Sequence, residues 1–218
     1  MNSTVVILLV VTGLIAVADW VAVARDNHQV ELAAKPLTLV ALMIAAAYAD
    51  LGAAKTWVMV ALAFGLVGDI ALMFSPDEGT DELDPAFLAG LGSFLLGHLA
   101  YYGAFIQHGL HGVQVAAGAL VALGATSLAM PRVLRGAKAQ GGTLLAAIVS
   151  VYAAVLGVMV VLAFGTAAIS TAIGGAIFLV SDTTIAWNRF VQPLQRGPII
   201  IIVTYHVAQV LILIGLAR

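Results

Sequence analysis

The sequence predicts an all-α protein, a polytopic bundle of about eight transmembrane helices. Of its 218 residues, 62% are hydrophobic and only 9% are charged, and the mean hydropathy is +1.10. Soluble domains carry about a quarter charged residues, so this composition indicates a membrane protein. Its apolar runs approach the roughly 20 residues that span a bilayer as a helix, and they lack the alternation of a β-barrel. We expect residues 1–218 to form one integral membrane domain.

Composition also excludes several classes of function. The net charge is −2, which gives no basic footprint for nucleic acid. Without cysteine the chain has no disulfide, no thiolate metal site and no cysteine nucleophile. The N-terminus lacks a basic segment and a cleavage site, so we interpret the first apolar run as a retained helix. No cofactor and no metal are expected.

Apolar length and proline placement define the predicted spans. They cover residues 4–24, 36–48, 56–74, 85–106, 113–130, 143–163, 167–187 and 198–216. Pro36 and Pro198 suit the first turn of a helix, and Pro131 is expected to close the fifth span. Phe164-Gly165-Thr166 is the short turn between the sixth and seventh spans. The connections are short, so the helices should pack as one bundle.

Lysine and arginine in short loops predict the orientation. With eight helices, the odd-numbered loops lie on one side of the membrane. They hold Arg25, Lys35, Arg132, Arg135, Lys138, Arg189 and Arg196, against Lys55 and Arg218 on the other side. We therefore expect the odd loops in the cytoplasm and both termini outside, in a bacterial inner membrane. The third loop carries Asp77, Glu78, Asp81, Glu82 and Asp84, interpreted as a solvated connector with a divalent cation site as the alternative.

Two carboxylates lie inside apolar spans. Asp69 follows Phe64-Gly65-Leu66-Val67-Gly68, and Asp182 follows Phe178-Leu179-Val180-Ser181. A charged residue at the centre of a span costs roughly 2.5–3.5 kcal/mol on insertion scales, so such residues are functional candidates. Both approach the cytoplasmic ends of their helices, so they can meet at one depth. Asp19, near Arg25, is interpreted as structural or interfacial.

Other polar side chains fall in the same half of the bundle. His98 and Tyr102 are four residues apart and share a helix face, as do Tyr205 and Gln209. His206 lies about 100° around the last helix. Lys35 and Arg189 are expected at the cytoplasmic mouth, and Tyr152 lies in the sixth span. Interhelical hydrogen bonding and an interfacial aromatic belt are the structural alternatives for the histidines and tyrosines.

Together these motifs resemble the YhhN-type lysoplasmalogenase family of multi-helix membrane proteins. The resemblance extends from the second predicted helix to the eighth. It rests on the order and spacing of Lys35-Pro36-Leu37-Thr38, Gly68-Asp69-Ile70-Ala71-Leu72, Phe94-Leu95-Leu96-Gly97-His98-Leu99-Ala100-Tyr101, Ser181-Asp182 and Tyr205-His206-Val207-Ala208-Gln209. His206 departs from the pattern, because an aromatic residue such as tyrosine is expected beside Tyr205.

The resemblance implies hydrolysis of the vinyl ether bond of a lysoplasmalogen to a fatty aldehyde and a glycerophospho-alcohol. That reaction protonates the alkene carbon remote from oxygen, and water captures the resulting oxocarbenium ion. Two close carboxylates suit it, because one tends to be protonated while the other stays charged. We expect Asp69 and Asp182 to be this acid/base pair.

In this interpretation, the other polar groups bind a lysophospholipid substrate. His98, Tyr102, Tyr205, His206 and Gln209 would orient water or substrate, and Lys35 and Arg189 would attract the lipid phosphate. Membrane lipids are the other expected partners, and no oligomeric state is indicated.

Three alternatives remain open from the sequence. The aspartates and histidines could hold zinc, although no tight H-x-x-x-H spacing is present. Intramembrane acids and histidines also mark the proton relays of proton-coupled transporters, and a lipid-binding membrane protein has similar needs. No inverted repeat supports transport. A purely structural membrane protein is the third alternative.

Overall fold

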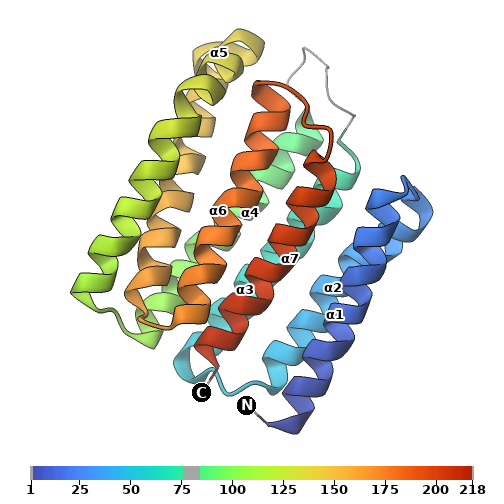
Figure 1. Cartoon of the computed structure of the whole chain (residues 1–218), viewed down its shortest axis with the longest axis vertical. Coiled ribbons are helices and arrows are strands. Elements are labelled where there is room, and N and C mark those ends of the chain that lie inside the picture. The colour runs from blue at the N-terminus through green and yellow to red at the C-terminus, as the bar shows by residue number, and fades with distance from the viewer. Residues whose placement is uncertain (1, 76–83, 218) are drawn as a thin grey trace.

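The structure is a computed structural model that describes residues 2–75 and 84–217. Its regular elements in these ranges are all helical (Figure 1). In chain order they are α1 (Ser3–Ala24), α2 (His28–Tyr48), the 3₁₀ turn η1 (Gly52–Ala54), α3 (Lys55–Met73), α4 (Pro85–His108), α5 (Gly112–Gly165), α6 (Ile169–Phe190) and α7 (Gly197–Leu216). Each of the seven α-helices is long and apolar enough to cross a membrane. The chain is therefore a multi-pass integral membrane protein.

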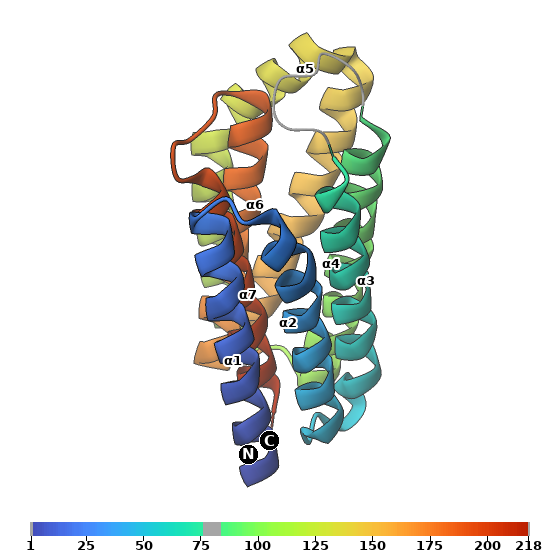
Figure 2. The ribbon, with the colours of Figure 1, turned by 90° about the vertical axis from the view of Figure 1, so that its right-hand side faces the viewer.

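Helix α5 crosses twice, because it folds back on itself. Its 54 residues would extend about 81 Å if straight, far more than the bilayer core of about 30 Å. Gly141 and Gly142 leave helical geometry, and Gly142 has φ +67°, a region that glycine enters without strain. Two arms, residues 112–140 and 143–165, therefore run side by side (Figures 1 and 2). Counting both arms, the described residues form eight membrane-length segments, in agreement with the prediction.

Two predicted boundaries at prolines were wrong. Pro131 lies inside α5, and the chain reverses at the Gly141-Gly142 pair instead. Pro36 lies inside α2, which begins eight residues earlier at His28. There the Asn27 side chain accepts a hydrogen bond from Val30 N at 3.3 Å and caps the helix.

The remaining boundaries lie within a few residues of the prediction. Helix α5 ends at Gly165 and α6 begins at Ile169, so the turn expected around residues 164–166 is confirmed. Pro198 falls in the first turn of α7, also as predicted.

Both termini lie at one end of the bundle (Figures 1 and 2). The opposite end, called the charged end below, holds the ends of α1, α3 and α6 and the reversal of α5. Asp69 is four residues from the end of α3 and Asp182 eight from the end of α6. At 1.5 Å per residue they lie about 6 Å and about 12 Å below those helix ends.

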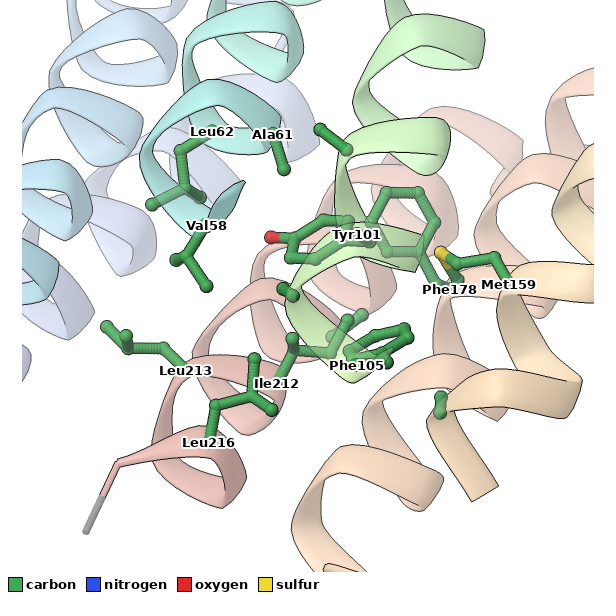
Figure 3. Packing of buried hydrophobic residues seen from close by; sticks show 14 of the residues in the cluster. Val58, Ala61, Leu62, Tyr101, Phe105, Met159, Phe178, Ile212, Leu213 and Leu216 are labelled. Carbon is green, nitrogen blue, oxygen red and sulfur yellow. The ribbon is translucent and has the colours of Figure 1, made fainter. Parts of the chain in front are cut away.

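Close helix packing fixes the interior. Helix α6 packs along α7 and the second arm of α5, and α3 packs along α4. At Gly174 of α6 a Cβ atom would lie 2.9 Å from the backbone oxygen of Ala208 in α7, so only glycine allows this approach. Figure 3 shows part of the core, with Tyr101 of α4, Phe178 of α6 and Met159 of α5. This packing holds α3, α4, α6 and α7 in register around the polar groups.

Candidate active site

Asp182 of α6 lies at the centre of a buried polar cluster. Its side chain accepts a hydrogen bond at Oδ2 from the Tyr152 hydroxyl of α5, at 2.5 Å. His98 of α4 places Nε2 3.6 Å from the same oxygen. Asp182 is 7% exposed and His98 1%. Three helices thus converge on one carboxylate.

The imidazole of His98 is held by rings and not by hydrogen bonds. It makes edge-on contacts with Phe178, at 4.9 Å between ring centroids, and with Tyr152 at 5.5 Å. Neither ring nitrogen has a hydrogen-bond partner in the described part of the chain. A buried imidazole with two unused nitrogens can accept a proton, or bind a water molecule or a substrate oxygen.

Asp69 of α3 forms the second half of the site together with α7. The carboxylate is 3% exposed and its Oδ2 lacks a hydrogen-bond partner among the described residues. The Tyr205 hydroxyl is close enough to interact with Asp69 electrostatically, without the geometry of a direct hydrogen bond. Gly65, one turn before Asp69, leaves room for the Tyr205 hydroxyl, because a Cβ atom on Gly65 would lie 2.8 Å from the hydroxyl oxygen.

The amide of Gln209 continues this half of the site. Gln209 Oε1 accepts a hydrogen bond from the Tyr101 hydroxyl, and its Nε2 would lie 3.4 Å from a Cβ atom on Gly65. Tyr205 and Gln209 therefore share the face of α7 that meets α3.

Tyr102, the tyrosine selected from the sequence, turns toward α5 and donates to the Val155 carbonyl at 2.5 Å. Tyr101 reaches the site instead. It is three residues after His98, a spacing that also shares a helix face, and this was the signal that sequence reasoning passed over.

Phe178 connects the two halves. Its ring contacts His98 on one side and Tyr205, at 5.5 Å, on the other. The carboxylates of Asp69 and Asp182 influence each other electrostatically across this region. No hydrogen bond joins them in the described ranges. The site is one electrostatic unit containing two carboxylates with different neighbours.

Lys35 of α2 extends this unit toward the charged end. The charge of Lys35 acts electrostatically on Asp69, His206 and Asp19. Its Nζ lies 3.6 Å from Glu31 Oε1. Asp19 was interpreted as structural or interfacial, and its burial contradicts the interfacial interpretation. Asp19 is fully buried, because its face of α1 turns inward, and neither of its oxygens has a hydrogen-bond partner within residues 2–75 and 84–217.

His206 is held from α1. Its Nδ1 accepts a hydrogen bond from Trp20 Nε1 at 3.1 Å, and its Nε2 has no partner among the described side chains. Sequence reasoning missed Trp20, since an isolated tryptophan near a helix end is typical of the membrane interface. Only the packing of α1 against α7 gives it this contact.

Two neighbouring cavities that share lining residues lie between the charged end and Asp182. The mouth cavity, of about 230 Å³, is lined by Glu31, Lys35, Ser75, Asn188 and Arg189 among apolar side chains. The inner cavity, of about 40 Å³, is lined by Tyr152 and Asp182 among apolar side chains. Leu72, Phe87 and Ile185 line both. Arg189 lies over the Phe87 ring at 5.0 Å, where the cavities meet.

Asp84 borders the mouth at the start of α4. Its carboxylate accepts hydrogen bonds from the Ser75 hydroxyl and from the backbone N–H groups of Ala86 and Phe87, the latter two at 3.0 Å. Partial burial acts to raise the pKa of Asp84, but these bonds and the charge of Arg189 outweigh it, so the pKa lies below its usual value. The other acids predicted in this loop (Asp77, Glu78, Asp81 and Glu82) lie outside the described residues.

No group of three histidine, aspartate or glutamate side chains with metal-binding proximity occurs within the ranges described. Asp182 and Tyr152 line the inner cavity, whereas neither His98 nor Asp69 is among the residues that line the mouth or the inner cavity.

Comparison with known proteins places this arrangement in a family. A curated relative, lysoplasmalogenase TMEM86B of Sus scrofa, is 31% identical over 176 residues, which cover 72% of this chain. The match spans 62% of that protein, less than two thirds of its length. No solved structure matches significantly. The YhhN family profile matches residues 30–216, from α2 to α7 and including both aspartates. The chain therefore belongs to the YhhN family.

Proposed function

We propose that this protein hydrolyses the vinyl ether bond of lysoplasmalogen-like lysophospholipids, with Asp182 as the group that gives and takes back the proton and Asp69 as a second carboxylate that acts through its charge. The main support is the position of Asp182. This buried carboxylate lines an apolar cavity that shares lining residues with a mouth containing cationic side chains. A lysophospholipid has the matching order of parts: a charged head, the ether linkage and an apolar chain. The name of the relative, a lysoplasmalogenase, supports the same reaction.

Asp182 is the carboxyl group that meets the alkene. In its protonated form it donates a proton to the alkene carbon remote from oxygen, and the double-bond electrons form the new C–H bond. The adjacent carbon becomes an oxocarbenium ion. Water attacks that carbon and gives a proton back to the Asp182 carboxylate, which restores the acid. The hemiacetal then breaks its bond to the glycerol oxygen, which takes up the hydroxyl proton, and releases the aldehyde.

The neighbours of Asp182 suit this cycle. The Tyr152 hydroxyl donates to Oδ2, so it stabilises the negative charge that develops there as the proton leaves. His98, with Nε2 3.6 Å from that oxygen and both nitrogens unused, is placed to hold the attacking water.

Asp69 supplies the second negative charge. Its electrostatic interaction with Asp182 disfavours a state in which both carboxyl groups are ionised. The same charge favours the oxocarbenium ion. Tyr205 and Gln209 hold this side of the site, and Asp69 needs no direct contact with the substrate for this role.

The mouth cavity fits a zwitterionic head group. Lys35 and Arg189 are the cations there, and they would bind the phosphate. Glu31 lines the same cavity and would face the ammonium group of an ethanolamine or choline head. Because short loops rich in lysine and arginine face the cytoplasm, we propose that the charged end is cytoplasmic and the termini outside, in a bacterial inner membrane.

The test is release of aldehyde from a lysoplasmalogen by the purified protein in detergent. Asp182→Asn should lower turnover by roughly 10²- to 10⁴-fold, the usual contribution of a general acid/base. Asp69→Asn should also lower it. Asp26→Asn is the matched control, because Asp26 is exposed in a loop and its φ of +51° is well tolerated by asparagine.

Reaction in D₂O adds an independent readout. Protonation at carbon predicts a deuterium on the aldehyde carbon next to the carbonyl. Full turnover by folded Asp182→Asn would rule out the acid assigned here. A stable wild-type protein that binds the lysolipid without releasing aldehyde would instead indicate the lipid-binding or transport alternative.

A further inference from the structure

A series of cavities that share lining residues extends from Asp182 to the two arms of α5. A second cavity of about 40 Å³, called the bridging cavity, shares Val149, Tyr152, Asp182 and Ala186 with the inner cavity. The bridging cavity in turn shares Thr126, Met130 and Ala153 with an apolar groove of about 430 Å³. We call this the interarm groove, because residues of both arms of α5 line it.

The interarm groove consists almost entirely of small and aliphatic side chains. Ala119, Ala122, Leu123, Thr126, Met130 and Leu134 come from the first arm. Ser150, Ala153, Ala154, Gly157, Val158 and Val161 come from the second. Its small side chains leave unfilled the space that larger side chains would occupy between the arms.

The groove has the length and direction of one lipid chain. From Ser150 to Val161 the second arm rises about 16 Å, close to half of a bilayer core of about 30 Å. Each leaflet of the bilayer is as thick as one lipid chain, so the length of the groove matches the depth that a lipid tail occupies. The groove starts near Tyr152 and runs away from the charged end, whereas the mouth cavity with Lys35 and Arg189 lies on the other side of Asp182.

We propose that the interarm groove binds the aliphatic chain of the lipid substrate, which enters sideways from the bilayer between the two arms of α5. This inference rests on the proposed function, since it assigns the tail of the same substrate. The head group lies at the mouth, the ether linkage at Asp182 and the chain in the groove. The arms of α5 are at the edge of the bundle, where the surrounding lipid is in reach (Figure 1).

Gly157 offers a direct way to fill the groove. A Cβ atom there would meet only Ala122 Cβ, at 4.0 Å, so a larger side chain has space. Replacing glycine inside a helix also removes a conformational penalty, so Gly157→Phe should fold. Gly124→Phe is the matched control: it lies on the first arm of the same helix, has nothing within 4 Å and does not line the groove.

The experiment compares turnover of a long-chain lysoplasmalogen with that of a short-chain homologue. Gly157→Phe should lower kcat/KM for the long-chain substrate by roughly tenfold to a hundredfold, because a blocked tail misplaces the reacting carbon. The short-chain substrate should react as with the wild-type protein, and Gly124→Phe should match the wild type on both. An unchanged long-chain kcat/KM in Gly157→Phe would overturn the proposal.

A second readout does not depend on hydrolysis. The probe is a saturated 1-O-alkyl lysophosphatidylethanolamine with a diazirine at the end of its chain, crosslinked by light and mapped by mass spectrometry. Labels on residues 119–134 and 150–161 that Gly157→Phe removes support the groove, even if no aldehyde is ever formed. Hydrolysis accompanied by labels confined to other helices refutes the groove while leaving the proposed function intact.

Discussion

Removal of the Tyr152 hydroxyl is the sharpest single change that this site allows. Tyr152→Phe deletes one oxygen, keeps the ring that packs on His98, and takes away the 2.5 Å hydrogen bond to Asp182 Oδ2. If Asp182 gives up its proton in the rate-limiting step, that bond strengthens as charge develops on the carboxylate. The hydroxyl then stabilises the transition state more than the ground state, so its loss should appear mainly in kcat.

The size of the effect follows from the type of bond. A hydrogen bond to a charged group contributes about 1.5–3 kcal/mol. At about 1.4 kcal/mol per factor of ten, this corresponds to a loss of roughly 10- to 150-fold in kcat. KM should change little, because Tyr152 lies at the ether linkage and not at the mouth.

Aldehyde release in detergent measures this loss, together with the thermal unfolding temperature of each variant. Tyr48→Phe is the control, since Tyr48 is 60% exposed near the other end of α2. A Tyr152→Phe protein with wild-type kcat would refute the assignment of Asp182 as proton donor. A rise in KM with unchanged kcat would instead place Tyr152 in ground-state binding of the substrate.

Three further predictions concern stability and head-group selectivity. Asp84→Ala removes the cap of α4 and should cost about 1 kcal/mol of stability at neutral pH. The pKa of Asp84 is lowered in the folded protein, so this stabilisation is complete above the unfolded pKa of about 3.9 and is lost as pH falls through the folded pKa. The melting temperatures of wild type and variant should therefore converge in acid. Glu31→Gln should lower kcat/KM for an ethanolamine substrate by up to about fivefold, as for a partly exposed ion pair, and leave a glycerol head group unaffected. Gly136→Ala should destabilise the protein by about 1–3 kcal/mol, because its Cβ would lie 1.6 Å from the Phe190 backbone oxygen. Gly124→Ala has open space around it and should stabilise the protein slightly. Thermal unfolding of both variants measures the difference.

The sequence by itself determined the class of protein and the course of the chain across the membrane. A helix that crosses the bilayer must be apolar along its length, because lipid is its solvent. Each span can therefore be predicted from its own residues, without knowing which helices pack beside it. The Phe164-Gly165-Thr166 turn could be predicted in this way, as could the start of α7. Between the end of α3 and the end of α6 the chain crosses the bundle four times, through α4, the two arms of α5 and α6. Because four is even, the ends of the helices that carry Asp69 and Asp182 lie on the same side.

Proline was an unreliable guide to where the helices begin and end. Pro36 and Pro131 lie inside helices, where neighbouring segments support the backbone around the missing N–H. The chain reverses where Gly142 adopts a positive φ. Hydropathy predicted the two spans, 113–130 and 143–163, that became the arms of α5. A glycine pair in a glycine-rich membrane protein gives no local sign of a turn, so the position of the reversal and the interarm groove could not be predicted from the sequence.

Only the tertiary structure decided which polar side chains meet. Helical spacing places residues on a common face, but it does not say which helix that face meets. His98 shares a helix face with both Tyr101 and Tyr102. In the packed bundle the Tyr101 hydroxyl donates to Gln209, whereas the Tyr102 hydroxyl donates to the Val155 carbonyl of α5. Likewise Asp19 and Trp20 point inward because α1 packs on α2 and α7. Spans are local properties of the chain, whereas interhelical contacts depend on the rotation and register of each helix, which are set by the whole bundle.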